Sequence, residues 1–214
     1  MAKRNEEIKG LVDEALRDHQ KIKKIISLLY DQDMERRLLG AKALGELARI
    51  EPEVIKKRWN RIFYAFDDTM SCWGAAEALG EIGRNLPDMR SRIVLFLRKF
   101  EKDEVSCQGF IWAVTRIGQI DRERIRNLIP ILIDFLKKDE PCMVGQAIWA
   151  LGELGISEAH DKIKGFLGDR REVWIYDNDS VRLMRISEIA SEAIHKIQSP
   201  EFINFSPKIA KLSL

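Results

Sequence analysis

The chain has 214 residues, of which 45% are hydrophobic and 33% are charged, and its formal net charge at pH 7 is +2. This composition excludes a disordered chain, and the lack of any apolar run of about 18 residues argues against a membrane span. The charged start MAKRNEEIKG contains no apolar signal core, so we expect a cytoplasmic protein. The net charge is too small to indicate a polyanionic partner.

An amphipathic helix is expected at the start of the chain. Its apolar face recurs at i, i+3, i+4, i+7 and i+8, on Ile8, Leu11, Val12, Ala15 and Leu16. Further helices follow in pairs, because apolar positions keep a helical spacing between Pro, Gly and Asp breaks. The first helix of each pair is expected near 19–30, 52–66, 87–101, 121–137 and 157–167, and the second near 34–49, 71–84, 104–119, 141–155 and 180–198.

The second helices repeat a short pattern of small residues. The aligned alanines are Ala43, Ala78, Ala113 and Ala150, at intervals of 35, 35 and 37 residues. Such a period is typical of stacked two-helix units, in which small residues let neighbouring helices approach closely. Aspartates precede the second helices at positions 33, 68, 103 and 139, where we expect them to cap the free N–H groups.

The combination of Asp, about ten further residues and then Ala-Leu-Gly-Glu-Ile-Gly (78–83) resembles the short HEAT repeats first described in phycobilin lyases. The resemblance covers about residues 20–198, although the usual Val-Arg pair occurs only at 181–182. It implies an all-α, right-handed α-α superhelix (a solenoid, armadillo-like) of about five HEAT-like hairpins plus the N-terminal capping helix. We expect one domain over 1–198, with repeats near 19–50, 51–85, 86–119, 120–155 and 156–198, and a tail over 199–214.

Catalytic and metal chemistry have little support in the sequence. The iron-binding branch of the resembling family uses His-Glu pairs, whereas His19, His160 and His195 are each followed by another residue. Cys72, Cys107 and Cys142 are spaced by 35 residues, which allows a redox or cluster site but fits buried, reduced thiols better. We therefore expect no enzyme activity, no cofactor and no metal.

The candidate partner-binding site is a stripe of residues that varies between repeats. By the resemblance, second helices line the concave surface, so this stripe is expected to face a groove in which tryptophans act as apolar anchors. The alternative is that Trp112 and Trp149 pack against the adjacent repeat. The stripe comprises Trp73, Glu77, Glu81, Gln108, Trp112, Arg116, Trp149 and Glu153.

Two further segments interrupt the repeat. An insertion over 168–180 carries Trp174 and Tyr176, and it is either a protruding loop that contacts a partner or a lid on the last hairpin. The tail over 199–214 is apolar in part and either caps the last repeat or forms a homodimer contact.

These observations favour a non-enzymatic scaffold or adaptor that binds a peptide or protein segment in its concave groove. The alternative is nucleic-acid binding, including activity like that of the HEAT-like DNA-alkylation-repair glycosylases. Basic residues on the first helices would serve it, but the groove stripe is acid-rich and would repel phosphates. A lyase-like or chaperone role is a third alternative, and no residue of the sequence indicates it.

Overall fold

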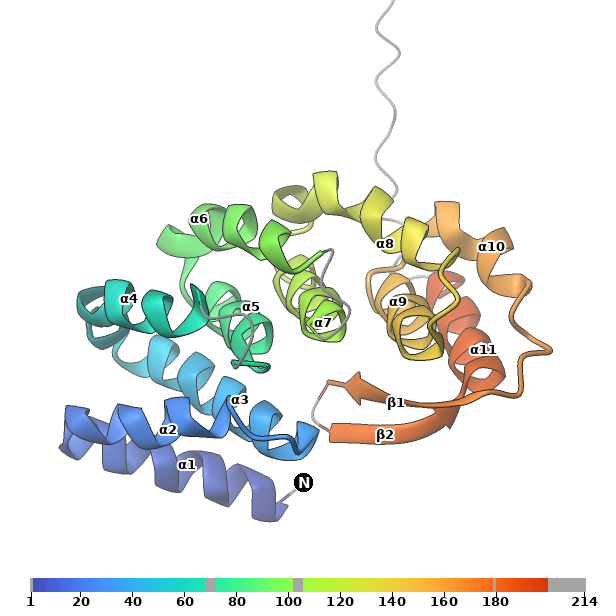
Figure 1. The fold of residues 1–214 in the computed structure, drawn as a ribbon. Helices are drawn as coiled ribbons and strands as arrows, with labels where there is room; N and C mark the ends of the chain where they lie inside the picture. Colours follow the sequence, from blue (N-terminus) through green and yellow to red (C-terminus); the bar gives the residue numbers. More distant parts are fainter. Residues whose placement is uncertain (1, 68–71, 102–105, 179, 200–214) are drawn as a thin grey trace, which may run out of the picture.

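The structure is a computed structural model that describes the backbone of residues 2–67, 72–101, 106–178 and 180–199, with side chains described from residue 3 onward except 61–67. The described residues are predominantly helical, with one small two-stranded sheet (Figure 1). The elements, including the short 3-10 helices η1–η4, are α1 (Ala2–Arg17), η1 (His19–Lys21), α2 (Ile22–Leu28), α3 (Met34–Ile50), α4 (Pro52–Asp67), α5 (Ala75–Asn85), α6 (Pro87–Leu97), η2 (Arg98–Phe100), α7 (Cys107–Gly118), η3 (Glu123–Leu128), α8 (Ile129–Phe135), α9 (Pro141–Glu153), η4 (Ser157–Ala159), α10 (His160–Lys164), β1 (Glu172–Asp177), β2 (Ser180–Arg185) and α11 (Ile186–Ile197).

The helices form two layers that follow an arc. The inner layer runs α3, α5, α7, α9, α11, each helix packed against the next, and α4, α6, α8 and α10 form the outer layer (Figure 1). Helices α1 and α2 pack on α3 at the N-terminal end of the arc. None of the helices in the described ranges is long and apolar enough to span a bilayer.

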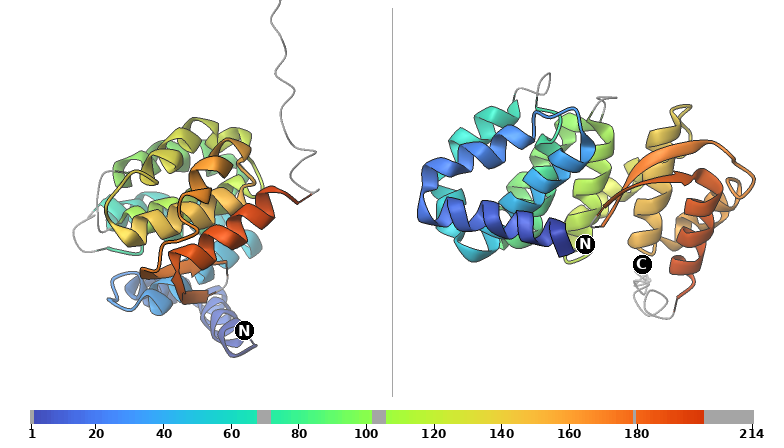
Figure 2. Two further views of the ribbon diagram at one scale, coloured as in Figure 1. Left: turned by 90° about the vertical axis from the view of Figure 1, so that its right-hand side faces the viewer. Right: turned by 90° about the horizontal axis from the view of Figure 1, so that it is seen from below.

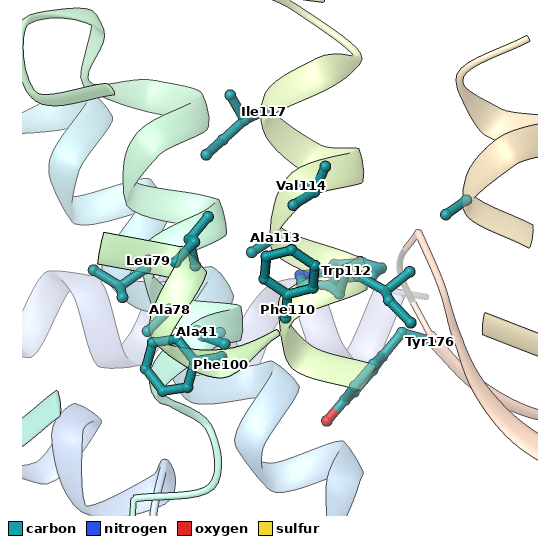
Figure 3. Packing of buried hydrophobic residues seen from close by; sticks show 14 of the residues in the cluster. Ala41, Ala78, Leu79, Phe100, Phe110, Trp112, Ala113, Val114, Ile117 and Tyr176 are labelled. Carbon is teal, nitrogen blue, oxygen red and sulfur yellow. The ribbon is translucent and has the colours of Figure 1, made fainter. Parts of the chain in front are cut away.

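The small residues of the repeat sit where inner helices touch, as the sequence predicts. Ala43, Ala78, Ala113 and Ala150 are fully buried. A Cβ atom built on Gly80 would lie 2.4 Å from the Cα atom of Ala113, and one built on Gly152 would lie 2.6 Å from the Cα atom of Ala193. At both places the backbones of two neighbouring helices are in contact and leave no room for a methyl group. The glycines therefore set the spacing between these helices. Figure 3 shows Ala78 and Ala113 within this core.

Alanine substitution of two helical glycines is expected to have effects of opposite sign. Gly80→Ala should lower the free energy of unfolding by about 1–3 kcal/mol, because the new methyl group overpacks the contact with Ala113. Gly10→Ala should raise the free energy of unfolding by up to about 1 kcal/mol. Alanine has the higher helix propensity, and a Cβ atom added at position 10 of α1 would have no other atom within 4 Å. Urea unfolding followed by circular dichroism measures both changes. Losses of equal size in the two variants would contradict this account of helix spacing.

The predicted caps are confirmed at one position and corrected at another. Asp33 accepts a hydrogen bond from the Glu35 N–H at 2.8 Å and caps α3. Before α9 the cap is Glu140, which accepts from the Cys142 N–H at 3.2 Å, so the prediction of Asp139 is wrong by one residue. Pro141 explains the shift, because proline favours the first helical position and makes its predecessor the cap. Residues 68 and 103 lie outside the described residues.

The expected all-α architecture is wrong near the C-terminus. The insertion and the first part of the predicted helix over 180–198 form an antiparallel hairpin, with Trp174 opposite Leu183, and α11 begins at Ile186. The runs VWIY and VRLM are rich in β-branched, aromatic and other large apolar residues, which favour strands. Asn178 has a φ of 46°, a left-handed conformation that asparagine tolerates in a turn. The tail from residue 200 onward, with its expected cap or dimer contact, lies outside the described residues.

Candidate functional site

The hairpin crosses the inner side of the arc and joins its two ends. We call β1, Asn178 and β2 (172–178 and 180–185) the strap. β1 packs on α9 and α7, and β2 packs on α11 and α3, so the strap touches helices from both ends of the chain. Figure 2 shows it from below, running from the α9 and α11 side toward the N-terminal helices. The lid expected on the last hairpin therefore extends much further, across most of the inner layer.

Side chains of the inner helices bind the main chain of the strap. Gln146, fully buried, donates from Nε2 to the Tyr176 carbonyl at 3.1 Å and accepts the Tyr176 N–H at 2.8 Å. Gln108 donates to the Trp174 carbonyl at 2.8 Å, and Glu35 accepts the Val181 N–H at 3.2 Å. These contacts satisfy outward-facing strand groups that would otherwise be left unpaired, so the strap is seated specifically on the helices.

The Tyr176 hydroxyl fastens the strap to the N-terminal half of the fold. Tyr176 is 1% exposed, and its Oη donates to Oε1 of Glu77 at 2.5 Å. Arg37 donates from Nη2 to the same hydroxyl at 3.4 Å, and its Nε lies 3.9 Å from the Glu77 carboxylate. Burial raises the pKa of the Glu77 carboxyl, while the Arg37 charge opposes the rise. Burial also raises the pKa of Tyr176 well above its ordinary value of 10.0, so the phenol remains a hydrogen-bond donor at neutral pH.

The groove tryptophans are packed beneath the strap. Trp112 is 0% exposed and stacks on Trp149 with ring centroids 5.7 Å apart. The ring of Tyr176 lies 5.4 Å from that of Trp112 (Figure 3). The expectation that both indoles are accessible anchors is therefore wrong, and the packed alternative holds for Trp112 and Trp149. Trp73 is half-buried, and Trp174 is 52% exposed.

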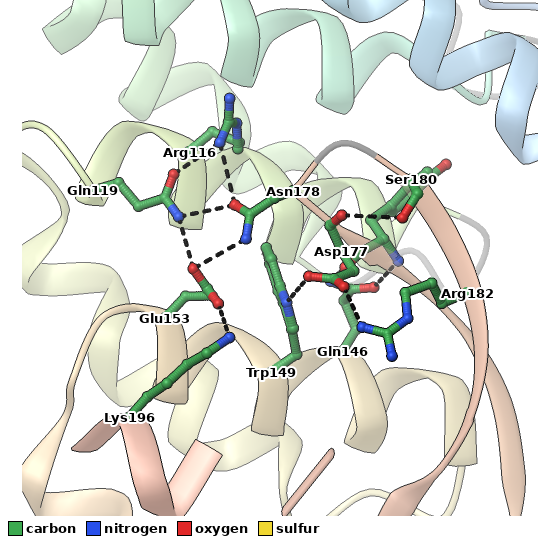
Figure 4. A network of polar contacts seen from close by, with 11 residues as sticks. Arg116, Gln119, Gln146, Trp149, Glu153, Asp177, Asn178, Ser180, Arg182 and Lys196 are labelled. Atoms are coloured by element: carbon green, nitrogen blue, oxygen red, sulfur yellow. Dashed lines mark hydrogen bonds and ion pairs between the residues drawn. The ribbon is translucent and has the colours of Figure 1, made fainter. Parts of the chain in front are cut away.

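A polar network surrounds the tip of the strap (Figure 4). Gln119 accepts from Nη1 of Arg116 at 2.9 Å and donates to Asn178 at 3.2 Å and to Glu153 at 3.0 Å. Glu153 also binds Lys196 of α11. Arg116 forms an ion pair of 2.7 Å with Glu81. The tip is thus held by charged and amide groups at the C-terminal ends of α7 and α9, and these groups are bound in turn by Glu81 of α5 and Lys196 of α11.

An open cleft of about 520 Å³ lies beside this network. Helix α1 forms one wall, and α3, α5 and α7 form the rest. The apolar lining comes from α1 and from the end of α3, and the polar lining comes from all four helices. The lining residues are Asn5, Ile8, Lys9, Val12, Asp13, Lys42, Glu46, Ile50, Glu81, Arg84, Asn85 and Arg116.

Seven of the eight residues of the predicted stripe are divided among three environments, and the eighth, Trp73, is half-buried. Glu81 and Arg116 line the cleft, Glu77, Gln108, Trp112 and Trp149 lie beneath or against the strap, and Glu153 joins the tip network. Sequence reasoning missed the contributions of α1, Arg84, Gln119 and Asn178. The helical spacing of α1 indicated only a capping role, and nothing in the period of the repeat indicated the position of the strap.

The residue types that bind metals do not cluster within the described part of the chain. No group of three or more His, Cys, Asp or Glu side chains there could hold an ion. Cys72 and Cys107 are buried, as expected, whereas Cys142 is only half-buried. Burial raises the pKa of the Cys142 thiol, which makes it a poorer nucleophile at neutral pH.

Comparisons with known proteins show similar chains but assign no function to any residue of this one. No family model matches the chain. A protein of Archaeoglobus fulgidus described as uncharacterized is 26% identical over 176 residues, which span 79% of this chain and 93% of the archaeal protein. A crystal structure of an engineered protein from the Northeast Structural Genomics Consortium is 17% identical, with a TM-score of 0.47 over 89% of this chain and 90% of that one.

Proposed function

We propose that the protein is a non-enzymatic scaffold of the HEAT-repeat, α-solenoid type that holds a segment of a partner protein in the cleft beside α1. The observation that carries this proposal is the cleft itself. Its volume of about 520 Å³ lies within the range of about 300–1,000 Å³ that is usual for ligand sites. That is room for a few residues of another chain.

The lining of the cleft suits recognition of a peptide. Ile8, Val12 and Ile50 offer apolar surface, and Ile50 is 46% exposed at the rim. Arg116 and Glu81 are fixed by their mutual ion pair, so their remaining donors and acceptors are already oriented before a partner arrives. Preorganised groups of this kind reduce the entropy that binding would otherwise cost.

Nucleic-acid binding has weaker support. Two basic side chains, one on outer helix α4 and one on η3, are paired with carboxylates: Lys56 lies 2.9 Å from Asp88, and Arg126 lies 3.3 Å from Glu123. A phosphate backbone would have to displace these partners. The cleft itself contains three carboxylates that would repel a row of phosphates.

Site-specific photo-crosslinking tests the proposed function. A benzophenone side chain placed at Ile50, on the rim of the cleft, is expected to give a discrete protein adduct in the native host. The matched control is Leu95, which is 72% exposed on outer helix α6 and should give none. Mass spectrometry identifies the adduct, and the purified partner is then titrated against wild type and Lys9→Glu. We expect the charge reversal to weaken binding at least about tenfold, as for a central interface residue. Equal adducts at both positions, or none at position 50, would contradict the proposal.

A further inference from the structure

We infer that the outer edge of β2 binds an extended segment of a partner protein, which adds to the strap as a third strand and places an apolar side chain next to Leu183. The described lining of the cleft beside α1 includes no residue of the strap, so this surface goes beyond the proposed function. Three features carry the inference: unpaired main-chain groups of β2, two exposed apolar side chains and the balance of charge in the strap.

The register of the hairpin determines which main-chain groups point away from it. In an antiparallel ladder, pairs that exchange hydrogen bonds alternate with pairs that do not. Gln146 binds both the N–H and the carbonyl of Tyr176, so the pair of Tyr176 and Val181 exchanges none. The pair of Trp174 and Leu183, two residues further along, is of the same kind. The N–H and the carbonyl of Leu183 therefore point away from β1.

The outward groups of β2 are capped at its two ends but not in its middle. Glu35 accepts the Val181 N–H at 3.2 Å, and Glu188 accepts the Arg185 N–H at 3.1 Å. Between them, the Leu183 N–H, the Leu183 carbonyl and the Val181 carbonyl have no hydrogen-bond partner among the described residues. Figure 1 shows β1 on one side of β2 and no helix or strand of the described chain along the other side. These three groups form a short open strand edge.

An extended polypeptide complements all three groups. In antiparallel pairing, the residue opposite Leu183 exchanges two hydrogen bonds with it, and the N–H two positions further along reaches the Val181 carbonyl. A second copy of β2 fits less well. Pairing Leu183 with its own copy places the second copy's Arg185 opposite Val181, but the Arg185 N–H is already bound by Glu188. Such a twofold pairing leaves the Val181 carbonyl without a donor.

The side chains beside the edge favour an apolar residue in the partner. Trp174 and Leu183 lie opposite each other on one side of the hairpin, and they are 52% and 50% exposed. A residue opposite Leu183 in an added strand extends this row. Contacts between large apolar neighbours on adjacent strands stabilise strand pairing. We therefore expect a large apolar residue at that position of the partner.

The charges of the strap are balanced within it. β1 and β2 carry two acidic and two basic side chains. Arg182 donates from Nη1 to Asp177 at 2.6 Å, and Arg185 lies 3.6 Å from Glu172. The two strands therefore have no net charge, which suits an apolar segment and offers no excess of cations to a phosphate backbone.

A peptide selection with a depletion step tests this inference on the full chain. Leu183→Pro removes the outward N–H without removing a ladder bond, and an edge strand tolerates proline at such a position. A random library of phage-displayed peptides is depleted on Leu183→Pro, which retains the cleft, and is then selected on the wild type. We expect the recovered peptides to share one position enriched in large apolar residues.

Matched variants then locate the bound peptide. Synthetic versions of the selected peptides should bind at least about tenfold more weakly to Leu183→Pro, because a carbonyl of the peptide loses its donor. Leu183→Val, which keeps the N–H, should retain binding. Lys9→Glu, which alters the cleft, should also retain it.

N-methylation of the peptides gives a readout that does not require Leu183→Pro to fold. Each N-methyl group removes one N–H, and in an added strand only every second N–H faces β2. Binding to the wild type should fall at alternate positions and persist at the positions between them. The Leu183 amide should also exchange its hydrogen more slowly when peptide is bound.

The contrary outcomes are equally defined. An empty selection, peptides that bind a folded Leu183→Pro as tightly as the wild type, or N-methyl effects that do not alternate would overturn the inference. A wild-type dimer in sedimentation that Leu183→Pro dissociates would assign the edge to a second copy and would overturn it too. The proposed function is tested separately, by crosslinking at Ile50 and by Lys9→Glu.

Discussion

Trp112→Ala is expected to lower the free energy of unfolding by about 3–5 kcal/mol, the usual range for removing a buried aromatic side chain. The Trp112 ring is 0% exposed and packs between the inner helices and the strap. Its loss removes the stack on Trp149 at 5.7 Å and the contact with Tyr176 at 5.4 Å. It also leaves a cavity that rigid neighbouring helices cannot fill. Urea unfolding followed by circular dichroism at 222 nm measures the change.

Trp174→Ala is the matched control, because it removes the same side chain from the exposed side of the strap. Trp174 is 52% exposed, so we expect a loss below about 1 kcal/mol. Were Trp112 an open anchor for a partner, as one reading of the sequence predicts, its removal would leave unfolding nearly unchanged. Similar losses in the two variants would therefore show that the strap does not cover Trp112 in solution.

The sequence predicted the contacts that repeat, because they are local and periodic. Ala78 and Ala113 occupy equivalent positions on successive helices, so one repeat predicts the packing of the next. The contacts of the strap do not repeat in this way. Tyr176 binds Glu77 from 99 positions away, a contact between two different elements for which a single sequence contains no periodic signal.

The sequence predicted the direction of the stripe but not the exposure of its side chains. The stripe does face the inner side of the arc, where Gln108 and Trp149 contact the strap and Arg116 reaches the cleft. A helical spacing gives the direction of a side chain, not what covers it. Whether Trp112 is exposed depends on where β1 and β2 lie, and the cleft depends on the position of α1, so neither follows from the repeat.

Glu77→Ala is expected to lower the free energy of unfolding by about 3–5 kcal/mol, the cost of removing one partner from a buried ion pair. Glu77 is 2% exposed and accepts the Tyr176 hydroxyl. Without the carboxylate, the Arg37 side chain, 12% exposed, loses its counter-charge, and the Tyr176 O–H loses its acceptor. Hydrogen exchange should also speed up in 172–178 and 180–185, because the strap loses its attachment to α5.

The loss caused by Glu77→Ala should depend on pH in a defined direction. Burial raises the pKa of Glu77 above its ordinary 4.5, so between that value and the raised pKa the folded state binds more protons than the unfolded state. The contribution of Glu77 is then complete below pH 4.5 and declines as pH rises through the raised pKa. Urea unfolding of the wild type and of Glu77→Ala at pH 4.5 and at pH 7 measures this contribution. The other titrating groups are the same in the two proteins, so their effects cancel when the two free energies of unfolding are subtracted. A loss that grows with pH would contradict the raised pKa.

A double-mutant cycle separates the hydrogen bond between Tyr176 and Glu77 from the other contacts of these two residues. Tyr176→Phe alone should cost about 1.5–3 kcal/mol, because it removes a hydrogen bond to a charged group and little volume. Combined with Glu77→Ala it should add much less, because both substitutions remove the same contact. Glu123→Ala is the control for losing an acidic partner at the surface, since its ion pair with Arg126 is exposed and should contribute less than about 1 kcal/mol. Full additivity in the cycle would mean that Tyr176 and Glu77 stabilise the fold independently, and that the strap is held by its main-chain bonds to Gln108 and Gln146 instead.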